Sequence, residues 1–237
     1  MQIDVVQLRD FYASPLGQVV TRLLASRIRS RWRNVSGGSL IGLGFATPYL
    51  GAFRPKAQRV GALMPLGQGA LIWPKSGPKS CCLVDEEKLP LADNSVDYLL
   101  VVHGFEMAGH VRPVLREMWR VLSPQGRLLM VVPNRRGIWA RTDRTPFGYG
   151  RPYSRGQLEA MLKEAMFTPI SWGTALFVPP FSRNTLLRTA VAWERAGAQI
   201  APAFGGVILV EALKELAAPI GTVKKRRVIL EMLPTRG

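Results

Sequence analysis

The stretch that decides the fold is VDEEKLPLADNSVDYLLVVHGFEMAGHVRPVLREMWRVLSPQGRLLMVVPN, Val84 to Asn134. Two short runs in it, Val96–Val102 and Arg127–Val132, are rich in Val and Leu and show little alternation of apolar and polar residues. Such runs are typical of parallel strands that are covered on both faces. Between them, Val111–Leu122 has apolar residues at helical spacing and is ended by Ser123–Gly126. This order predicts two parallel strands joined by a crossover helix.

Similar runs on either side extend the sheet. Two helices, divided at Ser14-Pro15, are expected before it. The Pro- and Gly-rich segment Pro65–Ser80 predicts that the helix usual after a second strand is missing or irregular. The further strands are expected at Leu40–Leu43, Arg59–Met64, Cys81–Val84, Thr168–Phe177 and Val207–Leu213, and further helices at Ser154–Leu162 and Leu186–Ala198.

The fold class predicted from this order is α/β, a doubly wound seven-stranded mostly parallel sheet with N-terminal helices. We expect the last run, Val207–Leu213, to lie antiparallel beside the fifth strand. The segment Asn134–Arg151 is rich in Gly, Pro and Arg and is interpreted as a long surface loop. The expected organisation is a helical cap at 1–36, the α/β domain at 37–217 and a basic tail at 218–237.

Composition narrows the functional classes without choosing among them. The 237 residues are 47% hydrophobic and carry a net charge of +16, which favours nucleic acid, an anionic membrane surface or an acidic protein as partner. The favoured interpretation of the basic clusters is a solvated arginine-rich surface, with nucleic acid as the minority alternative. The two cysteines, Cys81 and Cys82, form neither a disulfide framework nor a zinc ligand set, so we expect a cytoplasmic protein without a metal. No run is long and apolar enough for a membrane span.

The motifs of the opening stretch resemble those of class I S-adenosylmethionine-dependent methyltransferases, in particular the quinone C-methyltransferase branch. One motif is an acidic run leading into the fourth strand, and the other is Arg-Glu-x-x-Arg-Val-Leu-x-Pro before the fifth. The matching residues are Asp85, Glu87, Leu89, Pro90, Asp93, Ser95, Asp97, Arg116, Glu117, Arg120, Val121, Leu122, Pro124 and Gly126. The resemblance implies a Rossmann-like fold, S-adenosylmethionine as the cofactor and methyl transfer as the reaction.

The resemblance also implies a set of cofactor-binding residues at the strand ends. Gly44, followed by Phe45 and Ala46, matches the turn after the first strand, where a glycine lets the backbone approach the cofactor. Asp85 matches the carboxylate that accepts from the adenine amino group, and Glu86 would present its backbone N–H. His103 matches the floor under the cofactor, and Tyr12 a tyrosine that closes over it. Each has a structural alternative: a turn cap for Asp85, and plain packing for Tyr12 and for His103, which we expect to lack an orienting carboxylate.

Three departures from the family pattern concern the cofactor. Gly42 stands where the first strand normally has an acid, and Ala46 replaces the second glycine of the turn. The second strand ends at Met64, with no acid to hold the ribose hydroxyls. The two missing acids remove hydrogen bonds, the first of them charge-assisted, so we expect cofactor binding to be weak.

The expected function is methyl transfer to a small-molecule acceptor. The segment Arg141–Gln157 alternates arginines with aromatic residues, which suits an anionic or planar acceptor, and it makes Tyr149 and Tyr153 catalytic candidates together with His103. One alternative is a catalytically degenerate fold that serves as a binding or regulatory partner. A less favoured alternative is an RNA methyltransferase, because the fourth strand ends in VVHGFE and not in an Asn-Pro-Pro-Tyr type of motif.

Overall fold

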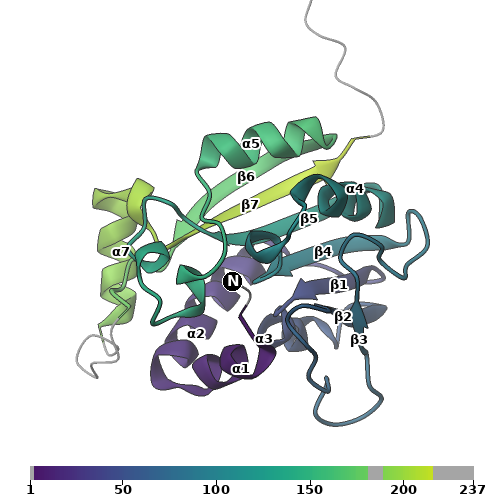
Figure 1. Ribbon diagram of the computed structural model, residues 1–237, viewed down its shortest axis with the longest axis horizontal. Helices are drawn as coiled ribbons and strands as arrows, with labels where there is room; N and C mark the ends of the chain where they lie inside the picture. Colours follow the sequence, from purple (N-terminus) through teal and green to yellow (C-terminus); the bar gives the residue numbers. More distant parts are fainter. Residues whose placement is uncertain (1–2, 181–188, 216–237) are drawn as a thin grey trace, which may run out of the picture.

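The computed structural model of the protein describes residues 3–180 and 189–215. Its centre is a seven-stranded sheet with the order β3-β2-β1-β4-β5-β7-β6 (Figure 1). β1 to β5 are parallel, and β7 is antiparallel to both β5 and β6. The strands are β1 Ser39–Gly44, β2 Arg59–Pro65, β3 Cys81–Val84, β4 Val96–Val102, β5 Leu122–Pro133, β6 Phe167–Ala175 and β7 Val207–Lys214. The predicted topology, including the antiparallel last strand beside β5, is confirmed.

The helices start where the sequence supplies capping groups. Asp4 accepts from the N–H of Val6 and begins α1, and Ser14 accepts from the N–H of Gly17 and begins α2 with Pro15 in its first turn. Ser154 and Gln157 form a capping box at the start of α5. The helices are α1 Val5–Ala13, α2 Pro15–Arg31, α3 Thr47–Leu50, α4 Val111–Val121, α5 Arg155–Glu164 and α7 Ala190–Ile200. The two predicted N-terminal helices and the crossover helix α4 are therefore confirmed.

Helices cover both faces of the sheet, so its strands are buried on both sides. Along β4, Leu100 and Val102 face the cluster that contains α1, α2 and α3, whereas Leu99 and Val101 face α4 and α5. Figure 1 shows α4 and α5 on one side of the sheet and the N-terminal helices on the other. This explains why the strands read as continuous apolar runs. α1 and α2 share their core with the sheet.

The acidic run that carries the family resemblance is tied to α4 by one arginine. The guanidinium of Arg120 donates to the carbonyls of Leu89 and Leu91 and to the carboxylate of Asp93. Glu117, which Arg120 also contacts, accepts from the N–H of Leu89 at 2.9 Å. The hydrogen bond from Arg120 holds the pKa of Glu117 below its ordinary value. These residues fix the path between β3 and β4.

Two connections matter for the site. No helix follows β2, as predicted, because residues 66–80 contain only turns and irregular structure. The surface-loop prediction for Asn134–Arg151 is wrong, because Trp139 and Phe147 are fully buried there on two 3₁₀ turns. The indole of Trp139 donates to the carbonyl of Val178 at 2.8 Å, and the apolar area of both rings favours their burial.

Some expectations fall on residues beyond the described ranges. The basic tail at 218–237 and the start of the expected helix at Leu186 lie outside them. The divisions at 36 and 217 stay predictions. Among the described helices, none is long and apolar enough to cross a bilayer. Within residues 3–180 and 189–215, no group of three or more His, Cys, Asp or Glu side chains could hold a metal ion.

Candidate functional site

The ends of β1 and β4 meet at Gly44. The N–H of Phe45 donates to the carbonyl of Val102 at 2.7 Å, and Gly44 has a φ of +83°. A Cβ at Gly44 would lie 2.3 Å from the Val102 oxygen, so only glycine fits the turn. Ligands of open α/β sheets bind at the carboxyl ends of the strands, near this position.

Gly42 is glycine because α3 packs directly on β1. A Cβ at Gly42 would lie 2.7 Å from the Cβ of Ala46 and 2.9 Å from Cδ1 of Leu50. A carboxylate side chain has no room between these groups. The missing acid at Gly42 therefore follows from the close packing of the turn after β1.

The end of β2 is closed by the segment that follows it. Met64 is buried, and its sulfur accepts from the N–H of Leu71 at 3.1 Å. The side chain of Gln68, also buried, donates to the carbonyl of His103. The carbonyl of Gln68 accepts from the N–H of Val5 at 2.8 Å, which joins this segment to α1. The end of β2 thus presents apolar and amide groups in place of a carboxylate.

Asp85 lies at the end of β3, two strands away from β1. Its side chain is exposed, and Oδ1 accepts from the N–H of Glu87 at 2.9 Å. This contact is the turn cap that was the structural alternative for Asp85. Glu86 beside it is partly buried. Contact of Asp85 and Glu86 with adenine stays a prediction.

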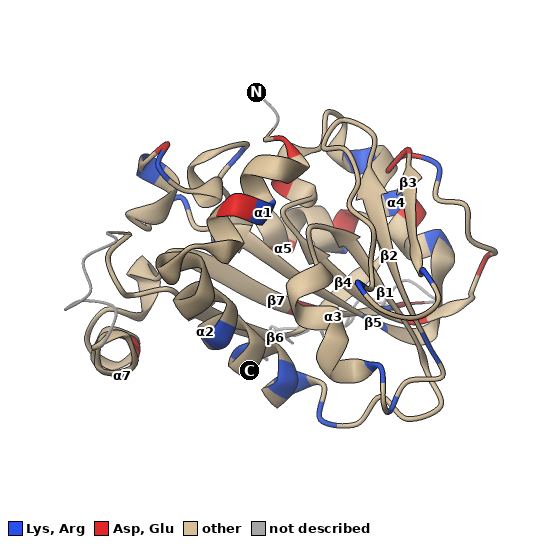
Figure 2. Cartoon of the chain, turned by 90° about the horizontal axis from the view of Figure 1, so that it is seen from below, with Lys and Arg blue, Asp and Glu red and all other residues tan. Residues whose placement is uncertain are grey.

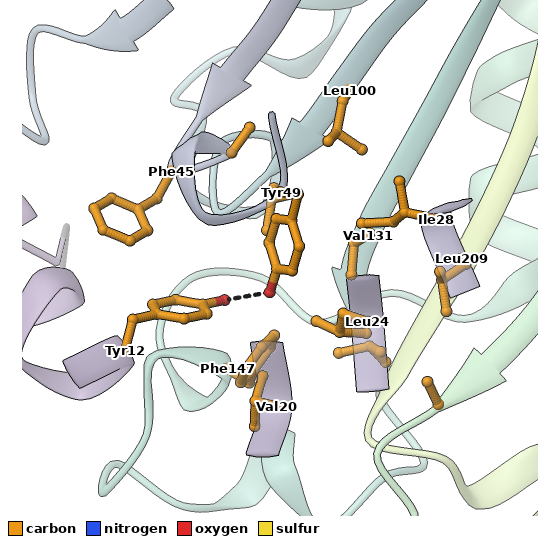
Figure 3. Packing of buried hydrophobic residues seen from close by; sticks show 14 of the residues in the cluster. Tyr12, Val20, Leu24, Ile28, Phe45, Tyr49, Leu100, Val131, Phe147 and Leu209 are labelled. Carbon is orange, nitrogen blue, oxygen red and sulfur yellow. Dashed lines mark hydrogen bonds between the residues drawn. The ribbon is translucent and has the colours of Figure 1, made fainter. Parts of the chain in front are cut away.

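The structure brings Tyr12 and His103 together beside the end of β1. The hydroxyl of Tyr12 lies 2.9 Å from Nε2 of His103. The same hydroxyl accepts from the hydroxyl of Tyr49 at 3.2 Å (Figure 3). The ring of Tyr12 stacks on Phe45 with centroids 5.3 Å apart. Residues from α1, the turn after β1, α3 and the end of β4 therefore converge on one point. Tyr49 was not predicted as part of this site.

A carboxylate lies beside His103, contrary to the expectation that none would be near it. Oε1 of Glu106 lies 3.3 Å from Nδ1 of His103, and both side chains are buried. Glu106 stands three residues after His103, on the 3₁₀ turn Phe105–Met107. The spacing in HGFE is the signal that could have revealed it, since one turn of helix brings positions three apart together.

The polar atoms of this pair lack hydrogen bonds within the described residues. They are Nδ1 of His103 and both carboxylate oxygens of Glu106. A buried carboxylate without donors carries a large desolvation cost, and an unsatisfied buried group of this kind is characteristic of a functional site.

The pair is enclosed by aromatic residues. The ring of Phe147 lies 4.6 Å from that of His103, and Figure 3 shows Phe147 close to Tyr12 and Tyr49. Only 9% of Tyr12 and none of His103 is exposed. Burial raises the pKa of Tyr12 and of Tyr49 well above the usual tyrosine value, so both hydroxyls stay protonated at neutral pH.

The other two tyrosine candidates lie further along the same covering segment. Tyr153 is buried with its ring 5.2 Å from Phe105, and burial raises the pKa of its phenol. Tyr149 is partly buried at the edge of the aromatic cluster. The arginines of this segment point elsewhere: Arg141, Arg144 and Arg151 are exposed, and Arg155 stacks over Trp172.

Solved structures with this fold include several methyltransferases. The chain is similar to a S-adenosylmethionine-dependent methyltransferase of Thermotoga maritima, described as a possible histamine N-methyltransferase, with a TM-score of 0.61 and 14% identity. That match covers 89% of this chain and 96% of the other. The [4+2]-cyclase SpnF matches with a TM-score of 0.59 and 20% identity, covering 84% of this chain and 82% of the cyclase. These likenesses show the fold, and the cyclase illustrates that the fold alone does not determine the reaction.

Sequence similarity to known proteins covers part of the chain. Residues 41–130 match the methyltransferase domain family. A ubiquinone/menaquinone biosynthesis C-methyltransferase of Ectopseudomonas mendocina is 45% identical over 47 residues, 20% of this chain and 18% of that protein. Its counterpart in Pseudomonas paraeruginosa is 41% identical over 56 residues, 24% of this chain and 22% of that protein. The matched segment thus spans about a fifth of these curated relatives. The domain match over residues 41–130 and the fold together thus make this chain similar to the S-adenosylmethionine-dependent methyltransferases.

Proposed function

We propose that the protein transfers the methyl group of S-adenosylmethionine to a small-molecule acceptor that loses a proton as it is methylated. The observation that carries this proposal is the buried His103–Glu106 pair, which lies at the end of β4 beside the β1 turn and has unsatisfied polar atoms. A base is useful in methyl transfer only when the acceptor atom carries a proton. The pair therefore bears on the acceptor as well as on the reaction.

The residues present fit the cofactor in part. The backbone of Gly44–Ala46 would approach its amino-acid end, and Asp85 with the N–H of Glu86 would bind the adenine. Neither Gly42 nor Met64 supplies the acid expected for the ammonium group and the ribose. Each missing contact costs roughly 1–3 kcal/mol, or one to two decades of affinity. When bound, S-adenosylmethionine supplies an electrophilic methyl group.

We infer that α1 moves when the ligands bind. Tyr12 of α1 stacks on Phe45 and contacts His103, so three residues expected to face the cofactor contact one another instead. The carbonyl of Gln68 and the N–H of Val5 join α1 to the segment after β2. Ligands that bind only the open arrangement would shift the population towards it.

His103 is proposed as the proton acceptor, and Glu106 as the group that positions it. A neutral imidazole accepts a proton at Nε2, and the Glu106 carboxylate beside Nδ1 stabilises the cation that forms. In the closed structure the Tyr12 hydroxyl contacts Nε2 of His103 and fills the position beside it. It marks the position where an acidic O–H, N–H or C–H of the acceptor would approach. Tyr12 itself stays a neutral phenol because of its raised pKa.

The surroundings favour a planar acceptor. Phe45 stacks on Tyr12 and Phe147 contacts His103, so both present flat apolar surfaces at this contact. An anionic substituent would meet exposed Arg141, Arg144 or Arg151 only at the outer edge of the covering segment. The acceptor thus needs an aromatic or conjugated body more than a negative charge.

The test follows methyl transfer from isotopically labelled S-adenosylmethionine to a panel of planar phenols, amines and carbon acids. His103→Asn should lower transfer by about 10²–10⁴-fold when the cofactor is saturating. His110→Asn is the matched control, because His110 is the other histidine, also contacts a glutamate, Glu87 at 2.8 Å, and is exposed. Full turnover by His103→Asn would refute the base assignment alone. Absence of cofactor binding to folded wild-type protein would refute the proposed function.

A further inference from the structure

α7 lies at one end of the molecule (Figures 1 and 2), and it carries large exposed apolar side chains. Ile200 is 83% exposed, Phe204 in the following turn 59%, and Trp193 43%. Trp193 and Ile200 are two helical turns apart and therefore lie on the same side of α7, with Ala196 between them. Solvent-facing positions of an ordinary surface helix are mostly polar. The apolar stripe formed by Trp193, Ala196 and Ile200 therefore indicates a surface that binds a partner.

Specific contacts hold the inner side of α7 against the rest of the molecule. The exposed stripe is therefore not the side of the helix that belongs in the core. Oε1 of the buried Glu194 accepts from the N–H of Phe177 at 2.6 Å. A Cβ at Gly197 would lie 2.5 Å from Phe177, which shows how closely the helix approaches this residue. With Glu194 and Gly197 turned inward, Trp193 and Ile200 remain on the outside.

Positive charge surrounds the exposed side chains. A groove of about 380 Å³ between α2 and α7 is lined by Leu23 and Val191 together with Arg27 and Arg195. Near the other end of α7, the side chain of Asn134 donates to the carbonyls of Ala203 and Gly205, which places exposed Arg135 and Arg136 next to the turn that carries Phe204. The only acid in residues 189–206 is Glu194, which also lines this groove but is buried and accepts from the N–H of Phe177.

We propose that this surface, α7 with the turn Pro202–Phe204, binds an anionic lipid bilayer. Trp193, Ile200 and Phe204 would insert at the level of the headgroups, where Trp is favoured, while the arginines contact lipid phosphates. A second copy of the chain fits this surface poorly, because each copy carries a net charge of +16 and the two would repel. The proposal does not depend on the reaction at the strand ends.

The experiment is co-sedimentation of the full-length protein with vesicles of phosphatidylcholine alone or mixed in equal parts with phosphatidylglycerol. Binding is expected to the anionic vesicles and to weaken as salt is raised, because screening reduces the charge attraction. The double variant Ile200→Ser, Phe204→Ser should bind about tenfold more weakly or worse. The matched control is Ile72→Ser with Leu66→Ser, two side chains of similar exposure, 71% and 59%, located between β2 and β3. This control should bind like the wild type.

Charge-reversal variants test the contribution of the arginines. Arg195→Glu should weaken binding to anionic vesicles by roughly fivefold or more, whereas Arg116→Glu on α4 should have a smaller effect. Circular dichroism and thermal unfolding would establish that every variant is folded. Equal binding by the two double variants would overturn the proposal, as would absence of binding by the wild type. Dimerisation that the Ile200→Ser, Phe204→Ser variant abolishes, without lipid binding, would assign the surface to a second copy and overturn it too.

Discussion

The hydroxyl of Tyr12 and Nε2 of His103 lie 2.9 Å apart although 91 positions separate them in the chain. The contact joins the first helix to the end of the central strand β4 and closes the candidate site. It also makes the Tyr12 hydroxyl the link between Tyr49 and the imidazole. The stability of the closed form should therefore depend on this one oxygen.

Tyr12→Phe is expected to lower the free energy of unfolding by about 1–3 kcal/mol, because it leaves two buried polar groups without their partner. Denaturant-induced unfolding measures the change. Tyr98→Phe is the control, since its hydroxyl contacts the carbonyl of Asn34 at 3.3 Å near solvent. It should change stability by less than about 0.5 kcal/mol. Equal effects of the two substitutions would show that the Tyr12 contact contributes no more than a surface hydrogen bond.

The buried phenols also predict an alkaline dependence. Burial raises the pKa of Tyr12 and Tyr49 above the usual value of about 10, so their contribution to stability is fully present below that pH. It is lost as the pH rises towards the folded-state pKa values. Of the five tyrosines, these two should ionise only when the chain unfolds, which phenolate absorbance and circular dichroism can follow together. Ionisation of all five near pH 10 in a folded chain would contradict the closed arrangement.

Gly44→Ala should destabilise the protein strongly, by about 2 kcal/mol or more, or prevent folding. The new Cβ would meet the Val102 carbonyl at 2.3 Å, and the backbone has a φ of +83°. Gly51→Ala is the matched control, because nothing lies within 4 Å of a Cβ there and Gly51 has an ordinary helical backbone. Thermal unfolding compares the two. A Gly44→Ala variant as stable as Gly51→Ala would mean that the β1 turn is looser than described.

The buried carboxyl of Glu194 predicts how stability depends on pH in the acidic to neutral range. Burial raises the pKa of Glu194. The hydrogen bond from the N–H of Phe177 and the charge of Arg27 lower it, but burial has the larger effect. A carboxyl with a raised folded-state pKa contributes stability below its unfolded pKa and loses it as the pH rises through the folded value. Glu194→Gln keeps an oxygen acceptor for Phe177 and cannot ionise. Its unfolding free energy relative to wild type should therefore increase from about pH 4.5 to pH 7.5. A constant or decreasing difference would show that the ionised form is not penalised.

The sheet could be predicted because its signals are local. Continuous apolar runs identify strands buried on both faces, and the helical spacing in α4 identifies a crossover connection. The run Val207–Lys214 comes late in the order of elements, and this position predicts the antiparallel strand beside β5. The family motifs Glu117 and Arg120 were recognised as well, and the structure shows that they support the path of Leu89 and Asp93.

The site was predicted less completely, because its contacts depend on packing between distant segments. Glu106 comes within reach of His103 only through a left-handed backbone at His103, with a φ of +50°, followed by a 3₁₀ turn. The reason for glycine at position 42 is the approach of Ala46 and Leu50, which no local pattern indicates. Phe147 was assigned to a surface loop because its neighbours are Gly, Pro and Arg, and its burial against His103 outweighs that composition.

The central claim is that this chain binds S-adenosylmethionine at the strand ends although two of the usual acids are missing. Calorimetric titration of the cofactor into the full-length protein tests it most directly. We predict weak saturable binding, with a Kd between about 10 µM and 1 mM, that Asp85→Ala abolishes. Glu86→Ala should retain it, because the expected contact there is the backbone N–H. No binding at millimolar cofactor by wild-type protein that circular dichroism shows to be folded would contradict the account and leave a methyltransferase fold without its cofactor.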